Sequence, residues 1–180
     1  MSSYILELKI ASDDSKLIEK YTEAVAKMQT EEYINNPHKD SGFDIYIPMA
    51  ENMICPDETR LVDLQIQCAA YKIVCDGEKC IKKPSPFYIY PRSSIYKSIL
   101  RLANNTGIVD SGYRGNLKGA FDNISRVGAS FPISTWYQQC EAYSRLLQIC
   151  MPDLSPFDVK IVESLDSTAR GSGGFGSTGK

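Results

Sequence analysis

Alternation of apolar and polar side chains dominates the chain and predicts many short β-strands. The alternation runs over residues 43–47, 62–68 and 87–90. A period of two is typical of a strand that packs one face on a core. Shorter strand-like stretches lie at 4–10, 106–109, 116–121, 129–133, 146–151 and 159–162. Many short strands separated by turn signals predict an all-β fold of the sandwich or jelly-roll type.

One N-terminal segment has helical periodicity instead. Between about Asp13 and Glu32, apolar side chains recur at helical spacing, at Leu17, Tyr21, Val25 and Met28. Acidic residues at the start suit the positive end of a helix, and the Asn-Asn-Pro run at 35–37 ends it. The pattern predicts a packed surface helix over 13–32, and a short helical turn is expected at 95–102.

The cysteines and the single histidine limit which metal sites and catalytic groups the chain can form. Six cysteines are scattered without a CxxC pair, which argues against a structural zinc site and favours free, buried or half-buried thiols. The only histidine, His38, lies in a polar stretch and is expected to be an exposed loop residue, not a catalytic base. Asp76-Gly77, between two apolar runs, predicts a β-hairpin turn.

Size and charge favour one domain without a strong electrostatic field. The chain has 180 residues and a formal net charge of −2, so we expect no direct nucleic-acid binding. It contains no run of 18 apolar residues, and its start lacks a secretory signal pattern. We therefore expect no membrane association and a cytoplasmic or nuclear protein. The domain should span 1–169, with a separate segment at 170–180.

The segment 170–180 reads RGSGGFGSTGK and cannot form a core, so it is expected to be a flexible arm. Glycine-rich backbone can present several N–H groups to one anion. Arg170, Ser177 and Thr178 add side-chain donors. Phe175 offers a stacking face, which a simple linker does not need. The composition is therefore compatible with an arm that binds a phosphorylated ligand, and the alternative is the disordered end of a linker.

Four further segments carry candidate chemistry. The segment NNTGIVDSGYRG (104–115) leads a short strand into Asp110 and a glycine turn. The segment PRSS (91–94) places Arg92 and two hydroxyls after a strand, which suits either a phosphate contact or a buried arginine pair. The remaining two are SGFDIY (41–46) and SRLLQI (144–149), the latter with Arg145 and Gln148 in an apolar strand.

Taken in chain order, as SGFDIY, PRSS, NNTGIVDSGYRG, SRLLQI and RGSGGFGSTG, the five segments resemble the five motifs of the trimeric dUTP pyrophosphatases (dUTPases). The resemblance covers about Asp40 to Lys180, and its third and fifth motifs are the most specific. The fourth motif departs from the family, which usually has Gly-Asp before the arginine where Tyr143 and Ser144 stand. The helix at 13–32 and the hairpin at 76–77 are additions to the compact family pattern.

The resemblance implies a jelly-roll-like subunit in a homotrimer, with active sites between subunits and the arm of one subunit closing a site formed by the others. It implies Mg²⁺-dependent hydrolysis of dUTP to dUMP and pyrophosphate, which limits uracil incorporation into DNA and supplies dUMP for dTTP synthesis. Asp110 is then the base that activates water for attack on the α-phosphorus, since an ionised carboxylate can accept a proton. Asp44 holds water on the metal.

The resemblance also assigns the remaining site residues. Tyr113 stacks under the deoxyribose and excludes a 2′-hydroxyl, and backbone at 104–107 reads the uracil edge. The substrate-binding set is Arg92, Ser93, Ser94, Asn104, Gly107, Tyr113, Gln148, Arg170, Phe175, Gly176, Ser177 and Thr178. A deaminase acting on dCTP is one alternative, although it fits the VDSGYRG turn poorly. The other is a non-catalytic or bifunctional dUTPase-like protein that binds a protein partner through the added helix and hairpin.

Overall fold

The computed structural model describes residues 3–48, 54, 57–124 and 142–174. The described helices are α1 (Ser15–Met28), α2 (Glu31–Asn35) and the 3-10 helix η1 (Ser93–Lys97). The strands are β1 (Ser3–Ile10), β2 (Gly42–Tyr46), β3 (Thr59–Asp63), β4 (Ile66–Asp76), β5 (Lys79–Ser85), β6 (Phe87–Pro91), β7 (Leu100–Leu102), β8 (Gly107–Val109), β9 (Lys118–Asn123), β10 (Arg145–Cys150) and β11 (Phe157–Ile161).

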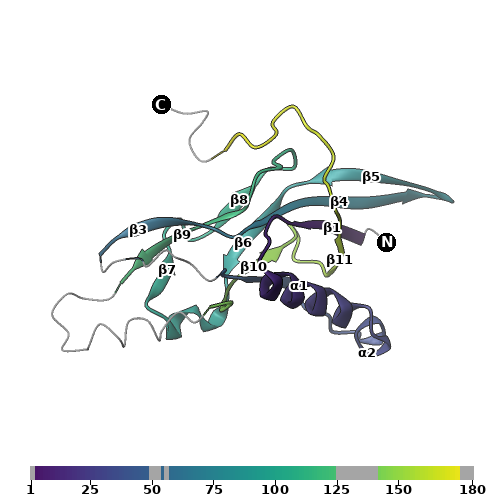
Figure 1. The fold of residues 1–180 in the computed structure, drawn as a ribbon. Coiled ribbons are helices and arrows are strands. Elements are labelled where there is room, and N and C mark those ends of the chain that lie inside the picture. The colour runs from purple at the N-terminus through teal and green to yellow at the C-terminus, as the bar shows by residue number, and fades with distance from the viewer. Residues whose placement is uncertain (1–2, 49–53, 55–56, 125–141, 175–180) are drawn as a thin grey trace.

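The strands form three sheets around one core, which confirms the expected all-β architecture (Figure 1). The sheet orders are β11-β1-β4-β5, β2-β10-β6-β8 and β3-β9-β7. Strands β1 and β11 pair in parallel, with Tyr4 opposite Phe157, so the first and last strands lie side by side. No helix in the described ranges is long and apolar enough to cross a membrane.

Helix α1 packs its apolar stripe into the core, as predicted, but the predicted segment contains two helices. Leu17, Tyr21 and Val25 are buried. The Asp14 carboxylate accepts from the backbone N–H groups of residues 16 and 17 and so starts α1 late. The Thr30 hydroxyl caps the separate helix α2. Side-chain caps therefore set boundaries that the apolar spacing does not reveal.

Two other predictions needed correction. The alternating stretch 62–68 is not one strand, because the backbone turns between β3 and β4 at Gln65, where φ is +55°. The helical turn expected at 95–102 is displaced to η1, and the residues after it form β7. The strand predicted at 129–133 lies outside the described residues. His38 is exposed, as expected.

The β4–β5 hairpin is present as predicted and projects from the other strands (Figure 1). Its turn contains Gly77 with φ of +59°, a conformation that glycine adopts without strain. The register opposes Cys75 to Cys80, and a disulfide joins them. The expectation that the cysteines are free was therefore wrong for this pair, because a tight turn brings the two side chains together. Cys68 and Cys150 are free and buried.

The sheet β2-β10-β6-β8 separates two faces that matter for the site. Directly opposed residues in a sheet point to the same face, and consecutive residues to opposite faces. Gln148 lies opposite both Asp44 and Tyr90, so these side chains share the outer face. Ile89 is buried and lies opposite Gly107, so this pair belongs to the inner face.

Candidate functional site

A tight turn after β8 presents Asp110. The Tyr113 N–H donates to the Asp110 carbonyl at 3.0 Å, which closes the turn. The Tyr113 hydroxyl donates to the Asn116 carbonyl at 2.8 Å, and its ring is buried. Burial also raises the pKa of Tyr113. A Cβ on Gly115 would lie 2.5 Å from the Tyr113 hydroxyl, so this position requires glycine. The turn therefore carries a buried, fixed tyrosine ring and an exposed carboxylate three residues apart.

This turn borders a cavity of about 150 Å³, which we call the loop pocket. Its lining includes Asn104, Gly107, Asp110, Tyr113, Lys118, Arg170 and Gly174. A Cβ on Gly107 would lie 3.2 Å from the Ile89 Cβ, so the strand presents bare backbone to the pocket. The Asp110 side chain is 51% exposed and forms an ion pair of 2.5 Å with Arg170. A small cavity with an accessible carboxylate at its edge is typical of a ligand site.

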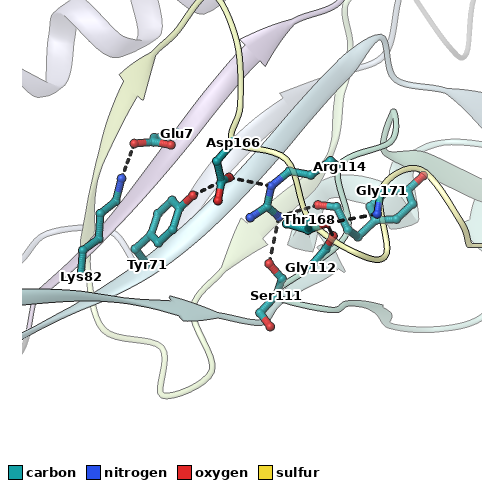
Figure 2. A network of polar contacts seen from close by, with 10 residues as sticks. Glu7, Tyr71, Lys82, Ser111, Gly112, Arg114, Asp166, Thr168 and Gly171 are labelled. Carbon is teal, nitrogen blue, oxygen red and sulfur yellow. Dashed lines mark hydrogen bonds and ion pairs between the residues drawn. The ribbon is translucent and has the colours of Figure 1, made fainter.

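The segment that leads into the arm is tied to this turn by a polar network (Figure 2). The Asp166 carboxylate accepts from Arg114 at 3.0 Å and from the Tyr71 hydroxyl at 2.8 Å. The Thr168 hydroxyl donates to the Gly112 carbonyl. Figure 2 shows these contacts bridging β4, the turn and the arm. The network joins three segments that are distant in the sequence.

Backbone contacts continue along the arm. The Arg114 N–H donates to the Gly171 carbonyl at 2.8 Å. A Cβ on Gly174 would lie 3.0 Å from the Tyr113 ring, so the arm backbone packs directly on that ring. Residues 170–174 therefore lie over the loop pocket of their own chain.

A second site lies on the outer face of β2, β6 and β10. The Asp44 carboxylate forms ion pairs with Arg92 at 2.7 Å and with Arg145 at 3.1 Å. Burial raises the pKa of Asp44, and the two guanidinium groups act in the opposite direction. A Cβ on Gly42 would lie 2.2 Å from the Gln148 side-chain oxygen, so glycine makes room for this side chain. These residues border a groove of about 900 Å³, the sheet groove.

The site residues predicted from the sequence thus fall into two groups. Asn104, Gly107, Asp110, Tyr113 and Arg170 border the loop pocket, whereas Asp44, Arg92 and Gln148 border the sheet groove. Among the described residues, none lines both cavities. Ser93 and Ser94 begin η1, directly after Arg92. Four predicted residues lie outside the described ranges: Phe175, Gly176, Ser177 and Thr178.

Several functional candidates were missed from the sequence. Arg145 belongs to the fourth motif, together with Gln148. Only the structure shows that its guanidinium forms an ion pair with Asp44. Asp166 and Thr168 lie just before the arm, in a run that matched the family, but their hydrogen bonds to the turn depend on the tertiary fold. Lys118 lines the loop pocket from β9, and no motif pointed to it.

The residues present fit a metal ion that is bound mainly by water and by the phosphates of a bound substrate, with few protein side chains as direct ligands. In the described part of the chain, no group of three or more His, Cys, Asp or Glu side chains could enclose an ion. Both oxygens of Asp44 already accept from arginines, so its carboxylate suits a water-mediated contact. Mg²⁺ usually keeps several waters and binds through substrate phosphates and one or two carboxylates. This donor set fits that mode.

Comparisons with known proteins identify the family of this chain. A protein-family model for dUTPase matches residues 31–179. The deoxyuridine 5′-triphosphate nucleotidohydrolase of African swine fever virus is 30% identical over 174 residues, covering 91% of this chain and 94% of that protein. The enzyme of the same name from Clostridioides difficile is 30% identical over 164 residues, covering 88% of this chain and 99% of that protein.

A solved structure also resembles the fold. The dUTPase of phage phi11 of S. aureus, determined as a mutant that reveals coordination of a structural Mg(II) ion, has a TM-score of 0.53. It shares 18% identity and covers 90% of this chain and 99% of its own. At this identity the likeness speaks for the fold alone. With the family model matching most of the sequence and relatives matching nearly their full length, the chain belongs to the dUTPase family.

Proposed function

We propose that the protein hydrolyses dUTP to dUMP and pyrophosphate by attack of water on the α-phosphorus. The loop pocket holds the deoxyuridine, and the sheet groove holds the triphosphate. The observation that carries this proposal is the half-exposed Asp110 carboxylate at the edge of a small cavity whose side is a buried tyrosine ring. Family membership agrees with it.

In this reaction Asp110 takes a proton from water as the water oxygen bonds to the α-phosphorus. The bond between the α-phosphorus and the bridging oxygen breaks, and pyrophosphate leaves with the electron pair. A carboxylate positioned as a general base typically contributes about 10²–10⁴-fold to the rate. The Arg170 guanidinium pairs with Asp110. A bound triphosphate offers Arg170 a stronger partner and frees the carboxylate for the water.

Discrimination against ribonucleotides comes from the fixed Tyr113 ring. Its hydroxyl is bonded to Asn116 and its ring is packed under Gly174, so the ring cannot turn aside for a 2′-hydroxyl. The bare backbone at Gly107 reads the uracil edge. Phe175 follows Gly174 in the chain and supplies a stacking face for the base.

Arg92, Arg145 and Gln148 contact the phosphates from the sheet groove. A triphosphate needs such dispersed donors, because its charge is spread over many oxygens. Mg²⁺, with Asp44 holding one of its waters, neutralises phosphate charge when bound. Ser93 and Ser94 add hydroxyl donors at the start of η1.

The two cavities lie on different faces of one sheet, so a single chain does not join them. We therefore propose a homotrimer in which the loop pocket and arm of one chain meet the sheet groove of the next chain. The contacts between the arm and its own turn support this arrangement. The protein should then elute near three times 20.1 kDa.

Pyrophosphate release tests the reaction. dUTP should be hydrolysed with Mg²⁺, whereas UTP and dCTP should be turned over at least about 10²-fold less efficiently, because a site that excludes or hydrogen-bonds a group discriminates strongly. Equal kcat/KM for dUTP and UTP would contradict the assignment of Tyr113. Release of ammonia from dCTP without pyrophosphate would favour the deaminase alternative, and release of neither product from any nucleotide would favour the non-catalytic one.

Mixed trimers test the sharing of the site. Asp110→Asn damages the loop pocket and Arg92→Ala damages the sheet groove, so each variant alone should be nearly inactive. After unfolding and refolding together in equal amounts, about a quarter of the sites in a three-fold assembly combine two intact halves. Activity should therefore return to roughly a quarter of the wild-type level. An absence of recovery, with trimers present, would show that each site lies within one chain.

A further inference from the structure

The added helix α1 contacts β2 and the residue two positions before β10, and these two strands carry the Asp44–Arg145 pair. Tyr143 stands where the resembling family usually has glycine, and its φ is +61°. A non-glycine residue keeps this left-handed conformation only where its surroundings hold it there. The question is what holds Tyr143, two positions before Arg145.

The Asp14 carboxylate supplies the main contact. One of its oxygens caps α1, accepting from the backbone N–H groups of residues 16 and 17. The other oxygen accepts from the Tyr143 hydroxyl at 2.7 Å. The Tyr143 N–H donates to the Ile47 carbonyl at 2.8 Å, which ties the same residue to the end of β2. One carboxylate therefore connects the start of the helix to the start of β10.

Three further contacts come from Lys20 and Tyr21 on the next turns of α1. The Lys20 ammonium lies 5.6 Å from the centre of the Tyr143 ring and 5.8 Å from that of Tyr46. The Tyr46 N–H donates to the hydroxyl of the fully buried Tyr21 at 3.1 Å. Tyr46 is also the register partner of Arg145, at the point where the β2–β10 pairing shifts. Helix α1 thus holds both strands where their own pairing is irregular.

From these contacts we propose that Asp14 and Tyr143 are positioning residues for the sheet groove: α1 fixes the strand ends so that Arg145 and Asp44 face the phosphates. This inference rests on the proposed function of the groove. It gives the added helix a role in substrate binding and explains why a tyrosine replaces the glycine of the fourth motif. The residues act through Arg145 and do not touch the substrate.

The decisive variant is Tyr143→Phe, which removes only the hydroxyl. Its affinity for a non-hydrolysable α,β-imido analogue of dUTP, measured by calorimetry with Mg²⁺, should fall about three- to tenfold, because Arg145 and Asp44 are then less well preorganised for the phosphates. Affinity for deoxyuridine should stay unchanged, because the nucleoside uses only the loop pocket. Asp14→Ser, which keeps a capping side chain, should have the same effect, and the double variant should add little to either.

Tyr4→Phe is the matched control, because Tyr4 also donates to an aspartate, Asp153, at 3.1 Å and borders neither cavity. It should leave both affinities unchanged. Unaltered analogue affinity in Tyr143→Phe, or an equal loss of deoxyuridine affinity, would overturn the inference even if thermal stability fell. If wild type binds no analogue, the proposed function of the groove fails instead, and the positioning role fails with it.

Discussion

The loop pocket and the sheet groove hold their functional side chains in position by different means. In the sheet groove, Asp44 and Gln148 stand opposite each other on paired strands, so the ladder itself sets their separation. In the loop pocket, Asp110 and Tyr113 stand on a turn that other segments must hold, through Asp166, Thr168 and the arm. A strand-borne site is set by register, whereas a loop-borne site depends on contacts between distant parts of the chain.

This difference has an energetic consequence. The contacts of the arm with the turn are few and partly exposed, and an exposed ion pair such as Arg170–Asp110 contributes only about 0–1 kcal/mol. Ordering each arm residue costs roughly 1–2 kcal/mol of backbone entropy. The loop pocket should therefore be the half that ligand binding completes, and the sheet groove the half that is already formed. The following experiments test this contrast.

Asp110→Asn should produce the largest effect. The amide cannot accept the proton from water, so kcat should fall by roughly 10²–10⁴-fold while affinity for the imido analogue persists. Initial rates of pyrophosphate release and calorimetry measure the two quantities. Asp158→Asn, at an exposed position on β11, is the control and should behave as wild type. Near-normal turnover in Asp110→Asn would remove this residue from the mechanism.

Deleting residues 170–180 should come next. Loss of Arg170 and of the covering backbone should reduce kcat/KM by about 10²-fold, because the pocket no longer closes around the substrate. The melting temperature should change by less than about 2 °C, since exposed ion pairs contribute little to stability. The elution volume should not change. Full activity in the truncated protein would show that the arm has no part in catalysis.

Asp166→Asn should have a moderate effect confined to the loop pocket. Although burial opposes the shift, hydrogen bonds from Tyr71 and Arg114 lower the pKa of Asp166, so the charged form holds the arm at neutral pH. The contribution of this carboxylate to stability is complete above the ordinary range of aspartate and is lost as the pH falls through the lowered pKa.

Because the Asp166 pair is half exposed, we expect kcat/KM for dUTP to fall only about 3- to 10-fold. Affinity for inorganic triphosphate, which needs only the groove, should stay constant in the same variant. Glu163→Gln removes a charge from the same segment at an exposed position and serves as the control. A loss of triphosphate affinity equal to the loss for dUTP would end the distinction between the two halves.

The smallest effect should follow loss of the Cys75–Cys80 disulfide. A loop this short gives about 2 kcal/mol in the chain-entropy model, so the melting temperature of a Cys75→Ser, Cys80→Ser double variant should fall by about 4–8 °C. Neither cysteine borders the loop pocket or the sheet groove, and kcat and KM should not change. Altered kinetics would show that the hairpin contributes to the site.

The sequence predicted the strands and helices of the fold better than the boundaries between them. Period-two alternation located most strands, because one buried face is a strong signal. It merged β3 and β4, since a positive φ at Gln65 leaves no trace in the hydrophobic pattern. The hairpin at Gly77 was predicted. In a hairpin with a two-residue turn at 77–78, Cys75 lies opposite Cys80. That inference requires the exact register, which the apolar pattern alone does not provide.

For the site, the sequence identified residue types and left their grouping open. The motifs named Asp110, Tyr113, Arg92 and Gln148, all of which border one of the two cavities. The division into two faces depends on strand pairing between segments separated by dozens of residues. The supporting residues Asp166 and Tyr143 depend on single hydrogen bonds across the fold, and no local pattern encodes these contacts.

The parallel pairing of β1 with β11 has a consequence for how the protein is made. The sheet is complete only after Phe157 has been synthesised and pairs opposite Tyr4. This pairing closes a very long loop, which slows folding. During synthesis β1 can pair only with β4, and its other edge stays open to neighbouring chains. A chain whose synthesis stops before residue 157 therefore exposes an unpaired edge of β1, which can pair with other chains. The arm is translated after β11, so a chain that stops before residue 170 also lacks the segment that covers the loop pocket.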